Sequence, residues 1–389
     1  MPASPTFGFT LPPALDVNLQ VSLAAFVERM GFDRLWLPDH LGYPDWSQAP
    51  CAWSLLTAMA MRTRRITLGT AVSDPHRVPP AVFAQRAATL DQISRGRVII
   101  GLGTGEAMNV APFGIAWDRR LARLKDTVAI TRALLDTRGP VHYDGALHSI
   151  PGGALSVRPY KERRIPIYLA ALGPKAQQLC GEVCDGWLPV VIPPEHFAHY
   201  HAPIIDAARA AGRDPSCIDR VANIPVALVD DEKASRMLVV ASARRYALTL
   251  VWPPVLEQMG MPLDSPPEFG DASYITVNPA DPESMARYRG LQRWIPEDVV
   301  MKFVYYGTMP RLKRIVGDYL DAGATSVTLV NVSPDPLEST VRLATELVPA
   351  FRGGRAPLLA RLARTALPLL KRVMPVPSAE RSVSATAGS

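Results

Sequence analysis

Cysteine is scarce in this sequence, with Cys51, Cys180, Cys184 and Cys217 among 389 residues. Four scattered cysteines are too few for a disulfide framework in a chain of this length. Cys180 and Cys184 are spaced to share one face of a helix, but no nearby His or Cys completes a set of zinc ligands. We therefore interpret the cysteines as reduced, structural thiols and expect no metal site.

Long apolar runs are also missing. No stretch of about twenty uncharged apolar residues occurs, so no transmembrane helix is predicted. The N-terminal sequence MPASPTFGFTLPP lacks the charged segment and the apolar segment of a secretory signal. The sequence therefore predicts a cytoplasmic protein.

The formal net charge of +6 is concentrated at the C-terminus. After Phe351 the chain carries one acidic residue, Glu380, and these basic residues: Arg352, Arg355, Arg361, Arg364, Lys371, Arg372 and Arg381. The chain up to Phe351 is thus balanced in charge, and its composition does not indicate a basic surface that would bind nucleic acid. Residues 351–375 alternate leucines with basic residues, a pattern typical of an amphipathic helix that contacts a membrane surface weakly or packs on a partner. Pro357 and Pro368 weaken this helix, so docking on the protein itself or disorder is the favoured alternative. Residues 376–389 are predicted to be disordered.

Short apolar segments alternate with helical patterns along residues 1–350. The predicted strands are 6–11, 32–38, 65–72, 98–100, 165–171, 186–192, 221–229 and 325–332. Strands that alternate with helices favour a parallel sheet with right-handed crossovers. Eight such units predict an α/β fold of the closed (β/α)8 TIM-barrel type, with an open, doubly wound sheet as the alternative.

Two insertions interrupt this regular spacing. Residues 140–159 predict a hairpin or loop between the fourth and fifth strands. Residues 251–300, between the seventh and eighth strands, are rich in Pro, Trp, Tyr and Met. This second insertion is too long for a plain connection, so we expect a lid or a substrate-binding element rather than disorder.

The segment RVIIGLGTGEAMN, residues 97–109, predicts a buried strand that runs into a glycine-rich bend. Its glycines do not fit a dinucleotide fingerprint, because that motif needs its last glycine one residue later. No GxSxG nucleophile elbow occurs either. The bend is therefore interpreted as one wall of the barrel mouth.

Polar residues follow several predicted strands, where a barrel builds its active site. Asp39 and His40 follow the second strand, and Glu106 and Asn109 follow the fourth. His40 is the best candidate acid or base, because histidine titrates near neutral pH. Glu106 would be a second proton donor if burial raised its pKa, or it would orient a ligand hydroxyl.

Several motifs resemble those of the luciferase-like flavin and deazaflavin oxidoreductases, over about residues 6–350. They are LWLPDH at 35–40, LGTAV at 68–72, RVIIGLGTGEAMN at 97–109, IYLAALGP at 167–174 and CDGWLP at 184–189. The combination of Asp-His with GTGEAMN is more similar to the branch that uses coenzyme F420. That branch includes glucose-6-phosphate dehydrogenases, methylenetetrahydromethanopterin reductases and phthiodiolone ketoreductases.

The resemblance implies a deazaflavin bound at the strand ends, with His40 and Glu106 flanking the site of hydride transfer. It also implies a non-prolyl cis peptide between Ala71 and Val72, behind the ring. The amides at Gly173, with the N-terminus of the next helix, would hold the phosphate-bearing tail. The cofactor-binding residues expected in this way are Asp39, Ala71, Val72, Asp74, Gly105, Asn109, Gly173 and Pro174.

The chain departs from the sugar-phosphate enzymes of this branch. Their lysine after the sixth strand is missing, although Lys302 could occupy another of their basic positions, so a phosphate monoester is not expected. Their aromatic residue after the Asp-His pair is replaced by Pro44, with Tyr43 and Trp46 on either side as candidate substrate contacts. The apolar insertion favours a hydrophobic or lipid-like ketone or a secondary alcohol.

The sequence thus predicts an F420-dependent oxidoreductase acting on a small-molecule substrate. An FMN-dependent monooxygenase is the enzymatic alternative, and a catalytically silent flavin-binding protein is the alternative from another class. The resemblance to barrel enzymes also implies a homodimer.

Overall fold

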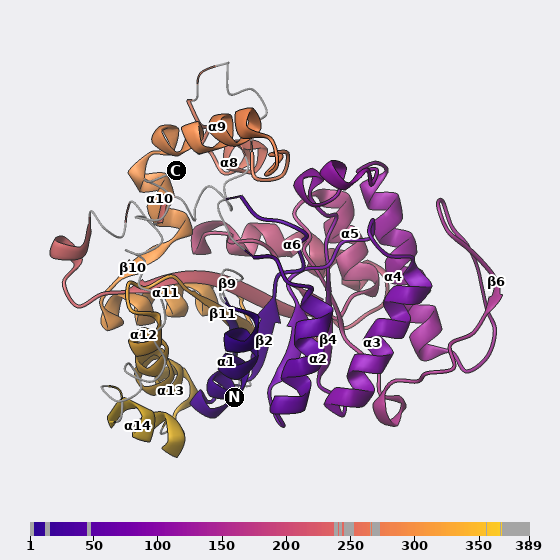
Figure 1. Ribbon diagram of the computed structural model, residues 1–389, viewed down its shortest axis with the longest axis horizontal. Helices are drawn as coiled ribbons and strands as arrows, with labels where there is room; N and C mark the ends of the chain where they lie inside the picture. The colour runs from indigo at the N-terminus through magenta and orange to yellow at the C-terminus, as the bar shows by residue number, and fades with distance from the viewer. Residues whose placement is uncertain are drawn as a thin grey trace.

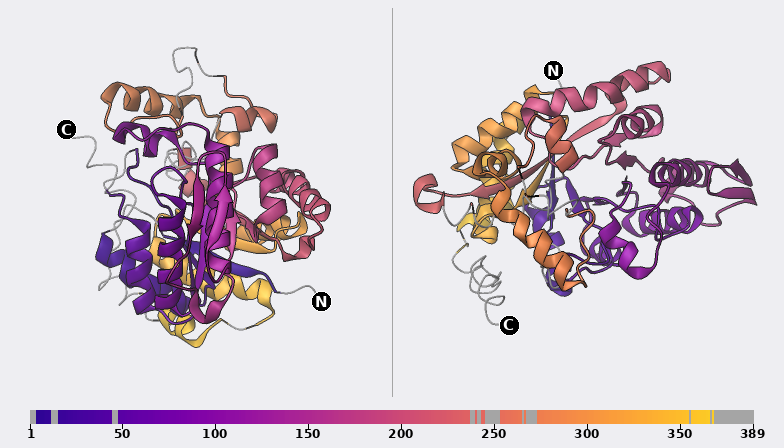
Figure 2. Two further views of the ribbon diagram at one scale, coloured as in Figure 1. Left: turned by 90° about the vertical axis from the view of Figure 1, so that its right-hand side faces the viewer. Right: turned by 90° about the horizontal axis from the view of Figure 1, so that it is seen from above.

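Parallel strands close into a barrel that runs through the centre of the molecule (Figures 1 and 2). In ring order they are β9 (Asp219–Leu228), β11 (Ser326–Asn331), β1 (Thr6–Thr10), β2 (Arg34–Leu37), β3 (Thr67–Thr70), β4 (Val98–Leu102), β7 (Ile167–Leu169) and β8 (Gly186–Trp187). Pairing between β8 and β9 completes the ring. The predicted (β/α)8 barrel is confirmed, and the open sheet is excluded.

The computed structural model describes residues 4–11, 16–44, 48–236, 240, 243–244, 253–264, 266, 273–354, 356–365 and 367. Helices surround the barrel: α1 (Val17–Met30), α2 (Ala52–Arg62), α3 (Pro80–Ser94), α4 (Arg120–Asp136), α5 (Pro174–Val183), α6 (Pro194–Ala210), α11 (Met309–Asp321) and α12 (Pro336–Arg342). Within this described part, no helix combines the length and the apolar character needed to cross a membrane.

Local signals explain where the helices begin and end. The carboxylate of Asp16 caps α1 by accepting the N–H groups of Asn18 and Leu19 at 2.9 and 3.1 Å. Gly31 ends the helix with a φ of 96°, a conformation that glycine adopts without strain. The side chains that α1 buries recur at helical spacing, so the sequence pattern correctly predicted which face packs on the barrel.

Two strand predictions needed correction. The sixth predicted strand, 186–192, pairs only at Gly186 and Trp187, because the residues that follow turn toward the barrel mouth. A short strand, β10 (Tyr305–Gly307), was missed and pairs in parallel with the end of β9. Three residues are too few for a recognisable alternating pattern.

Both insertions take ordered forms in the described residues. The first is an antiparallel hairpin of β5 (Val141–Asp144) and β6 (Ser149–Gly153), as predicted. The second includes α8 (Pro253–Gln258), α9 (Pro282–Gly290) and α10 (Glu297–Phe303), and Figure 1 shows α8 and α9 at the top of the molecule. The chain then ends its described part with α13 (Val348–Arg352) and α14 (Leu358–Thr365).

A polar cluster closes the barrel interior at the amino ends of the strands. Arg34 on β2 forms an ion pair with Asp219 on β9, and the Tyr168 hydroxyl donates to the same carboxylate at 2.8 Å. Burial alone would raise the pKa of Asp219, but the Arg34 charge and hydrogen bonds from Ser326 and Thr325 lower it below its ordinary value. The carboxylate therefore stays ionised and ties several strands together.

Candidate active site

A cavity of about 970 Å³ lies at the carboxyl ends of the strands, under the second insertion. Predicted site residues that line it are His40, Tyr43, Ala71, Val72, Gly105, Glu106, Gly173 and Pro174. Predicted site residues outside its lining are Asp39, Asp74, Asn109 and Lys302, while Trp46 lies outside the described residues. Most of the strand-end residues thus share one cavity, as the barrel rule predicted.

His40 is held between two tyrosines. Its ring stacks on Tyr43, with the centroids 4.5 Å apart, and its Nδ1 lies 3.1 Å from the hydroxyl of Tyr274. Burial lowers the pKa of His40 below its ordinary value of 6.5, although the charges of Glu106 and Asp39 oppose this. Because the Tyr274 hydroxyl occupies Nδ1, Nε2 is the ring nitrogen left for a bound substrate.

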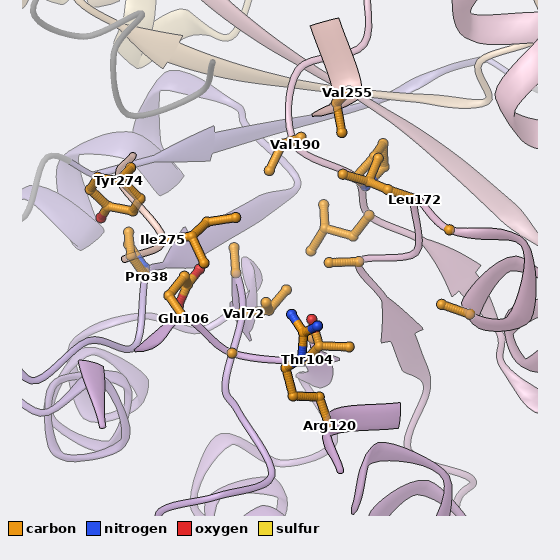
Figure 3. Close-up of a pocket in the computed structure, with 18 of the residues that line it drawn as sticks. Pro38, Val72, Thr104, Glu106, Arg120, Leu172, Val190, Val255, Tyr274 and Ile275 are labelled. Carbon is orange, nitrogen blue, oxygen red and sulfur yellow. The ribbon is translucent and has the colours of Figure 1, made fainter. Parts of the chain in front are cut away.

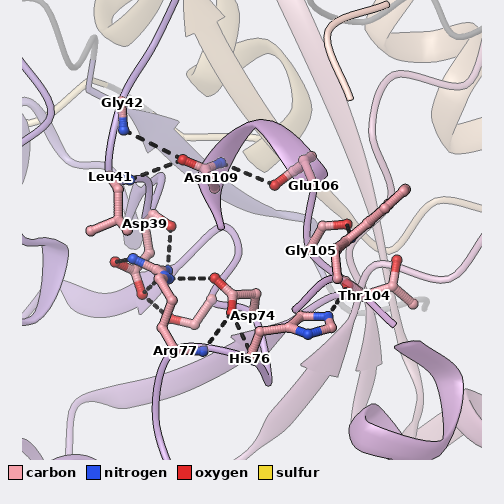
Figure 4. Close-up of polar contacts among 12 residues, drawn as sticks. Asp39, Leu41, Gly42, Asp74, His76, Arg77, Thr104, Gly105, Glu106 and Asn109 are labelled. Atoms are coloured by element: carbon pink, nitrogen blue, oxygen red, sulfur yellow. Dashed lines mark hydrogen bonds and ion pairs between the residues drawn. The ribbon is translucent and has the colours of Figure 1, made fainter. Parts of the chain in front are cut away.

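Glu106 is positioned by Asn109 (Figure 4). The Asn109 amide donates to Glu106 Oε2 at 3.2 Å, and its carbonyl oxygen accepts the N–H groups of Leu41 and Gly42 at 2.9 and 3.4 Å. Asn109 therefore joins the loop after β4 to the loop that carries His40. Asn109 lies outside the cavity lining beside Glu106, and its contact with a cofactor stays a prediction.

Asp39 and Asp74 meet at Arg77 beneath the cavity (Figure 4). Arg77 pairs with both carboxylates, and Asp39 also accepts the Ser73 hydroxyl at 2.5 Å. Burial disfavours the Arg77 cation, but the two carboxylates outweigh it and raise the pKa of Arg77. Because these groups satisfy one another away from the lining, any effect of Asp39 or Asp74 on a cofactor would be indirect.

The peptide bond between Ala71 and Val72 is cis, in agreement with the expectation from the family resemblance. The glycine-rich bend fits against this bulge, since a Cβ at Gly103 would lie 2.7 Å from Val72 Cγ2. A Cβ at Gly101 would lie 1.9 Å from the Thr70 carbonyl oxygen. The first two glycines of the bend are therefore required by the close approach of β3 and β4.

Sequence reasoning missed the cations that border the cavity at the starts of α4 and α5. Arg119, Arg120 and Lys175 line the cavity together with Gly173. Arg120 lies 4.2 Å from the centroid of the Trp117 ring. Among the residues that the structure describes, none of the three cations forms an ion pair, so their charge is available to an anion. The signal in the sequence was the paired arginine that opens α4.

The second insertion contributes directly to the cavity. Tyr274 and Ile275 line it, and the Met108 N–H donates to the Ile275 carbonyl oxygen at 3.0 Å. Figure 3 shows Tyr274, Ile275 and Glu106 on one side of the cavity and Arg120 on another. The expected lid or substrate-binding element thus takes part in the cavity wall.

Lys302 does not join this cavity. Its Nζ lies 3.4 Å from Glu195 Oε1, and its side chain is 41% exposed in the last turn of α10. The prediction that Lys302 contacts substrate is therefore not supported by its position. No cluster of three or more His, Cys, Asp or Glu side chains in the described part of the chain could hold a metal ion.

His40, Glu106 and three cations thus line one cavity at the carboxyl ends of a parallel barrel, together with Ala71 and Val72 of the cis peptide bond. Residues 6–325 match the sequence model of the luciferase-like monooxygenases, and the chain belongs to this family. The family prediction is confirmed.

Two curated relatives and one solved structure illustrate the similarity. A 5,10-methylenetetrahydromethanopterin reductase of Methanolobus tindarius is 30% identical over 325 residues, which cover 83% of this chain and 93% of the relative. An F420-dependent glucose-6-phosphate dehydrogenase of Microbacterium testaceum is 34% identical over 222 residues, which cover 55% of this chain and 65% of the relative. The structure of an F420-dependent secondary alcohol dehydrogenase with an F420-acetone adduct has a TM-score of 0.75 and 25% identity, and the match covers 90% of this chain and 100% of that one.

Proposed function

We propose that this protein is an F420-dependent oxidoreductase that moves hydride between the deazaflavin and the carbon centre of a ketone or secondary alcohol. The observation that carries the proposal is that His40 and Glu106 line one cavity beside the cis bulge. The F420-dependent relative and the alcohol dehydrogenase structure support the choice of cofactor. An imidazole and a carboxylate can exchange protons with a bound substrate, so proton transfer is their proposed chemistry.

The cavity suits a deazaflavin in shape and in polar groups. Its volume of about 970 Å³ is in the range of cofactor sites, and Gly103 and Gly105 keep one wall flat. Deep in the cavity, the indole nitrogen of Trp36 and the side-chain oxygen of Asn223 are buried without a hydrogen-bond partner in the described residues. Both residues belong to the cavity lining, so the cavity wall includes polar groups whose hydrogen bonds are not supplied by the described residues.

The mouth of the cavity suits the phosphate-bearing tail. Gly173, Pro174 and Lys175 at the start of α5 line the cavity, so the positive end of the helix dipole lies at its wall. Lys175 in the first turn of α5, with Arg119 and Arg120 at the start of α4, adds positive charge to the cavity lining. A negatively charged group bound there would be stabilised both by the helix dipole and by these cations.

The protein side chains would manage the proton while the bound deazaflavin supplies or accepts the hydride. Reduction of a ketone adds hydride to the carbonyl carbon and a proton to the oxygen. The imidazolium form of His40 would donate that proton and become neutral, and neutral His40 would accept the hydroxyl proton when an alcohol is oxidised. Glu106, held by Asn109, would orient the reacting oxygen or return the proton to His40.

The walls near His40 favour an apolar substrate. Val190, Leu172, Val255 and Ile275 line the cavity, and Lys302 pairs with Glu195 instead of entering it. A phosphate monoester would need several cations close to the reacting carbon. Arg120 of the lining lies away from Glu106 and Tyr274 (Figure 3). A hydrophobic or lipid-like ketone or alcohol fits this distribution better.

An activity screen tests the proposal. Purified protein is mixed with reduced or oxidised F420 and a panel of ketones, alcohols and imines, and the deazaflavin absorbance is followed. We expect turnover with at least one apolar ketone or alcohol, and a loss of about 100-fold or more in His40→Asn and Glu106→Gln. Full rates in both variants would contradict the assigned chemistry. Turnover only with reduced FMN and oxygen would identify a monooxygenase instead.

A further inference from the structure

The C-terminal helix α14 packs on the barrel through its alanines and leaves its leucines in solvent. Ala360 is fully buried, and α14 contacts α1 and α12. Leu358, Leu359 and Leu362 are 65%, 53% and 54% exposed, and we call these three side chains the leucine face. A surface helix normally turns its apolar stripe inward. Adjacent exposed leucines on one side of a helix therefore indicate an interaction surface.

Basic groups border the leucine face. Arg361 is exposed on α14, and it takes part in no ion pair among the described residues, whereas Arg364 pairs with Glu346 at 2.9 Å. A hollow of about 620 Å³ beside α14 is lined by Arg361 as well as by Leu358 and Leu362. An apolar helix face edged by arginine is the pattern of helices that lie in the interface of a lipid bilayer.

Other arginines lie at the same end of the barrel. Pro357, at the start of α14, packs against Gly31, where a Cβ would lie 2.6 Å from Pro357 Cγ. The preceding turn of α1 carries exposed Arg29, and its Glu28 accepts the Arg64 N–H at 2.9 Å. Arg29 and exposed Arg64 thus flank the helix turn that α14 contacts. The positive charge extends from α14 onto the barrel.

We propose that the leucine face docks on an anionic lipid bilayer. The leucines would enter the boundary between headgroups and acyl chains, and the arginines would bind anionic headgroups. Beyond α14 the sequence adds the bases Lys371, Arg372 and Arg381 against Glu380 alone. A second copy of this chain is a poorer occupant, because a two-fold contact places the same arginines of both copies together.

Docking through this face would not bring the cavity to the membrane. In Figure 1, α14 lies at the bottom of the molecule, while α8 and α9 of the insertion lie at the top. Residues of α8 line the cavity, so its mouth faces away from the leucine face. The contact would locate the protein at a membrane surface without passing substrate directly from the bilayer. This inference does not depend on the proposed oxidoreductase function.

Vesicle co-sedimentation of the full-length protein tests the docking. The probes are vesicles of phosphatidylcholine with phosphatidylglycerol and vesicles of phosphatidylcholine alone. We expect sedimentation with the anionic vesicles, at least fivefold less with the neutral ones, and a decrease as salt is added. The double variant L359E/L362E should sediment with the anionic vesicles at least fivefold less than the wild type. Leu362→Gln alone should lose about half of it.

Val82→Glu is the matched control. Val82 is 40% exposed in the first turn of α3, so the substitution also places a carboxylate on an exposed apolar position. It should leave vesicle binding unchanged, and all variants should keep the wild-type circular dichroism spectrum. Equal binding to both vesicle types, or full anionic binding by L359E/L362E, would overturn the proposal. A fall from dimer to monomer in L359E/L362E by light scattering would also overturn it, because the face would then bind a second copy.

Discussion

The hydroxyl of Tyr274 lies 3.1 Å from Nδ1 of His40, although the two residues are 234 positions apart in the sequence. The contact joins the second insertion to the loop after β2. A hydroxyl bound to Nδ1 orients the imidazole and fixes its tautomer, and it leaves Nε2 for the reaction. Tyr274 is therefore expected to act as a positioning residue for His40.

Substitution of Tyr274 by Phe tests this relationship. Removal of the hydroxyl keeps the ring but no longer fixes the tautomer, so we expect the hydride-transfer rate to fall about tenfold. The pH profile of the rate should shift, while F420 affinity should change little. Tyr305→Phe is the control, since the Tyr305 hydroxyl contacts Tyr319 at 3.0 Å and Tyr305 does not line the cavity. Equal rates and pH profiles in Tyr274→Phe and wild type would exclude this role.

The pH dependence of stability tests the burial of His40. Burial lowers the pKa of His40 in the folded protein, so the unfolded chain binds more protons between the lowered pKa and the ordinary value of 6.5. The free energy of unfolding should therefore decrease as the pH falls through this window. One such group contributes a slope of at most about 1.4 kcal/mol per pH unit.

His40→Asn should reduce that slope in denaturant titrations at several pH values. His201→Asn is an informative comparison, because burial also lowers the pKa of His201 but its ring lies outside the cavity lining. Both variants should reduce the pH dependence of the free energy of unfolding. Only His40→Asn should abolish activity. An unchanged slope in His40→Asn would show that this imidazole is not buried as a neutral group.

The ion pair between Arg34 and Asp219 is expected to stabilise the closed barrel. Asp219→Asn would leave the largely buried Arg34 guanidinium without its counter-charge and should lower the free energy of unfolding by about 3 kcal/mol. Asp206→Asn is the control, because its pair with Arg209 is exposed and should contribute less than about 1 kcal/mol. Chemical denaturation measures the free energy of unfolding of both variants. Equal decreases in the two variants would contradict the stabilising role of the ion pair between Arg34 and Asp219.

The cations of the cavity lining, Arg119, Arg120 and Lys175, are expected to bind the phosphate-bearing tail of the cofactor. Arg120→Ala should weaken F420 binding about tenfold, or about 1.4 kcal/mol, and should reduce its dependence on salt. Arg209→Ala removes an exposed arginine of α6 that does not line the cavity and should have no effect. Fluorescence titration at two salt concentrations gives both quantities. An unchanged affinity in Arg120→Ala would remove this arginine from the cofactor site.

The barrel could be predicted from the sequence because its signals are local. Each buried strand is a short apolar run, and the polar residues after the strands mark the carboxyl ends where a barrel places its site. His40 and Glu106 were identified in this way and line one cavity. The strand β10 carries too few residues to show such a signal.

The support behind the site could not be predicted in the same way. The contacts of Tyr274 with His40 and of Arg77 with Asp39 depend on how separate loops fold back over the barrel. Sequence spacing identified Asp39, Asp74 and Asn109 as site residues, but it could not show that their side chains satisfy neighbouring protein groups. The exposed leucine face likewise became visible only when the packing of α14 was known.

Cofactor preference tests the central claim most directly. The purified full-length protein is titrated separately with F420 and with FMN under the same buffer and salt, and binding is followed by fluorescence. We predict that F420 binds at least tenfold more tightly than FMN. Tighter binding of FMN, or no saturable binding of F420, would contradict the account.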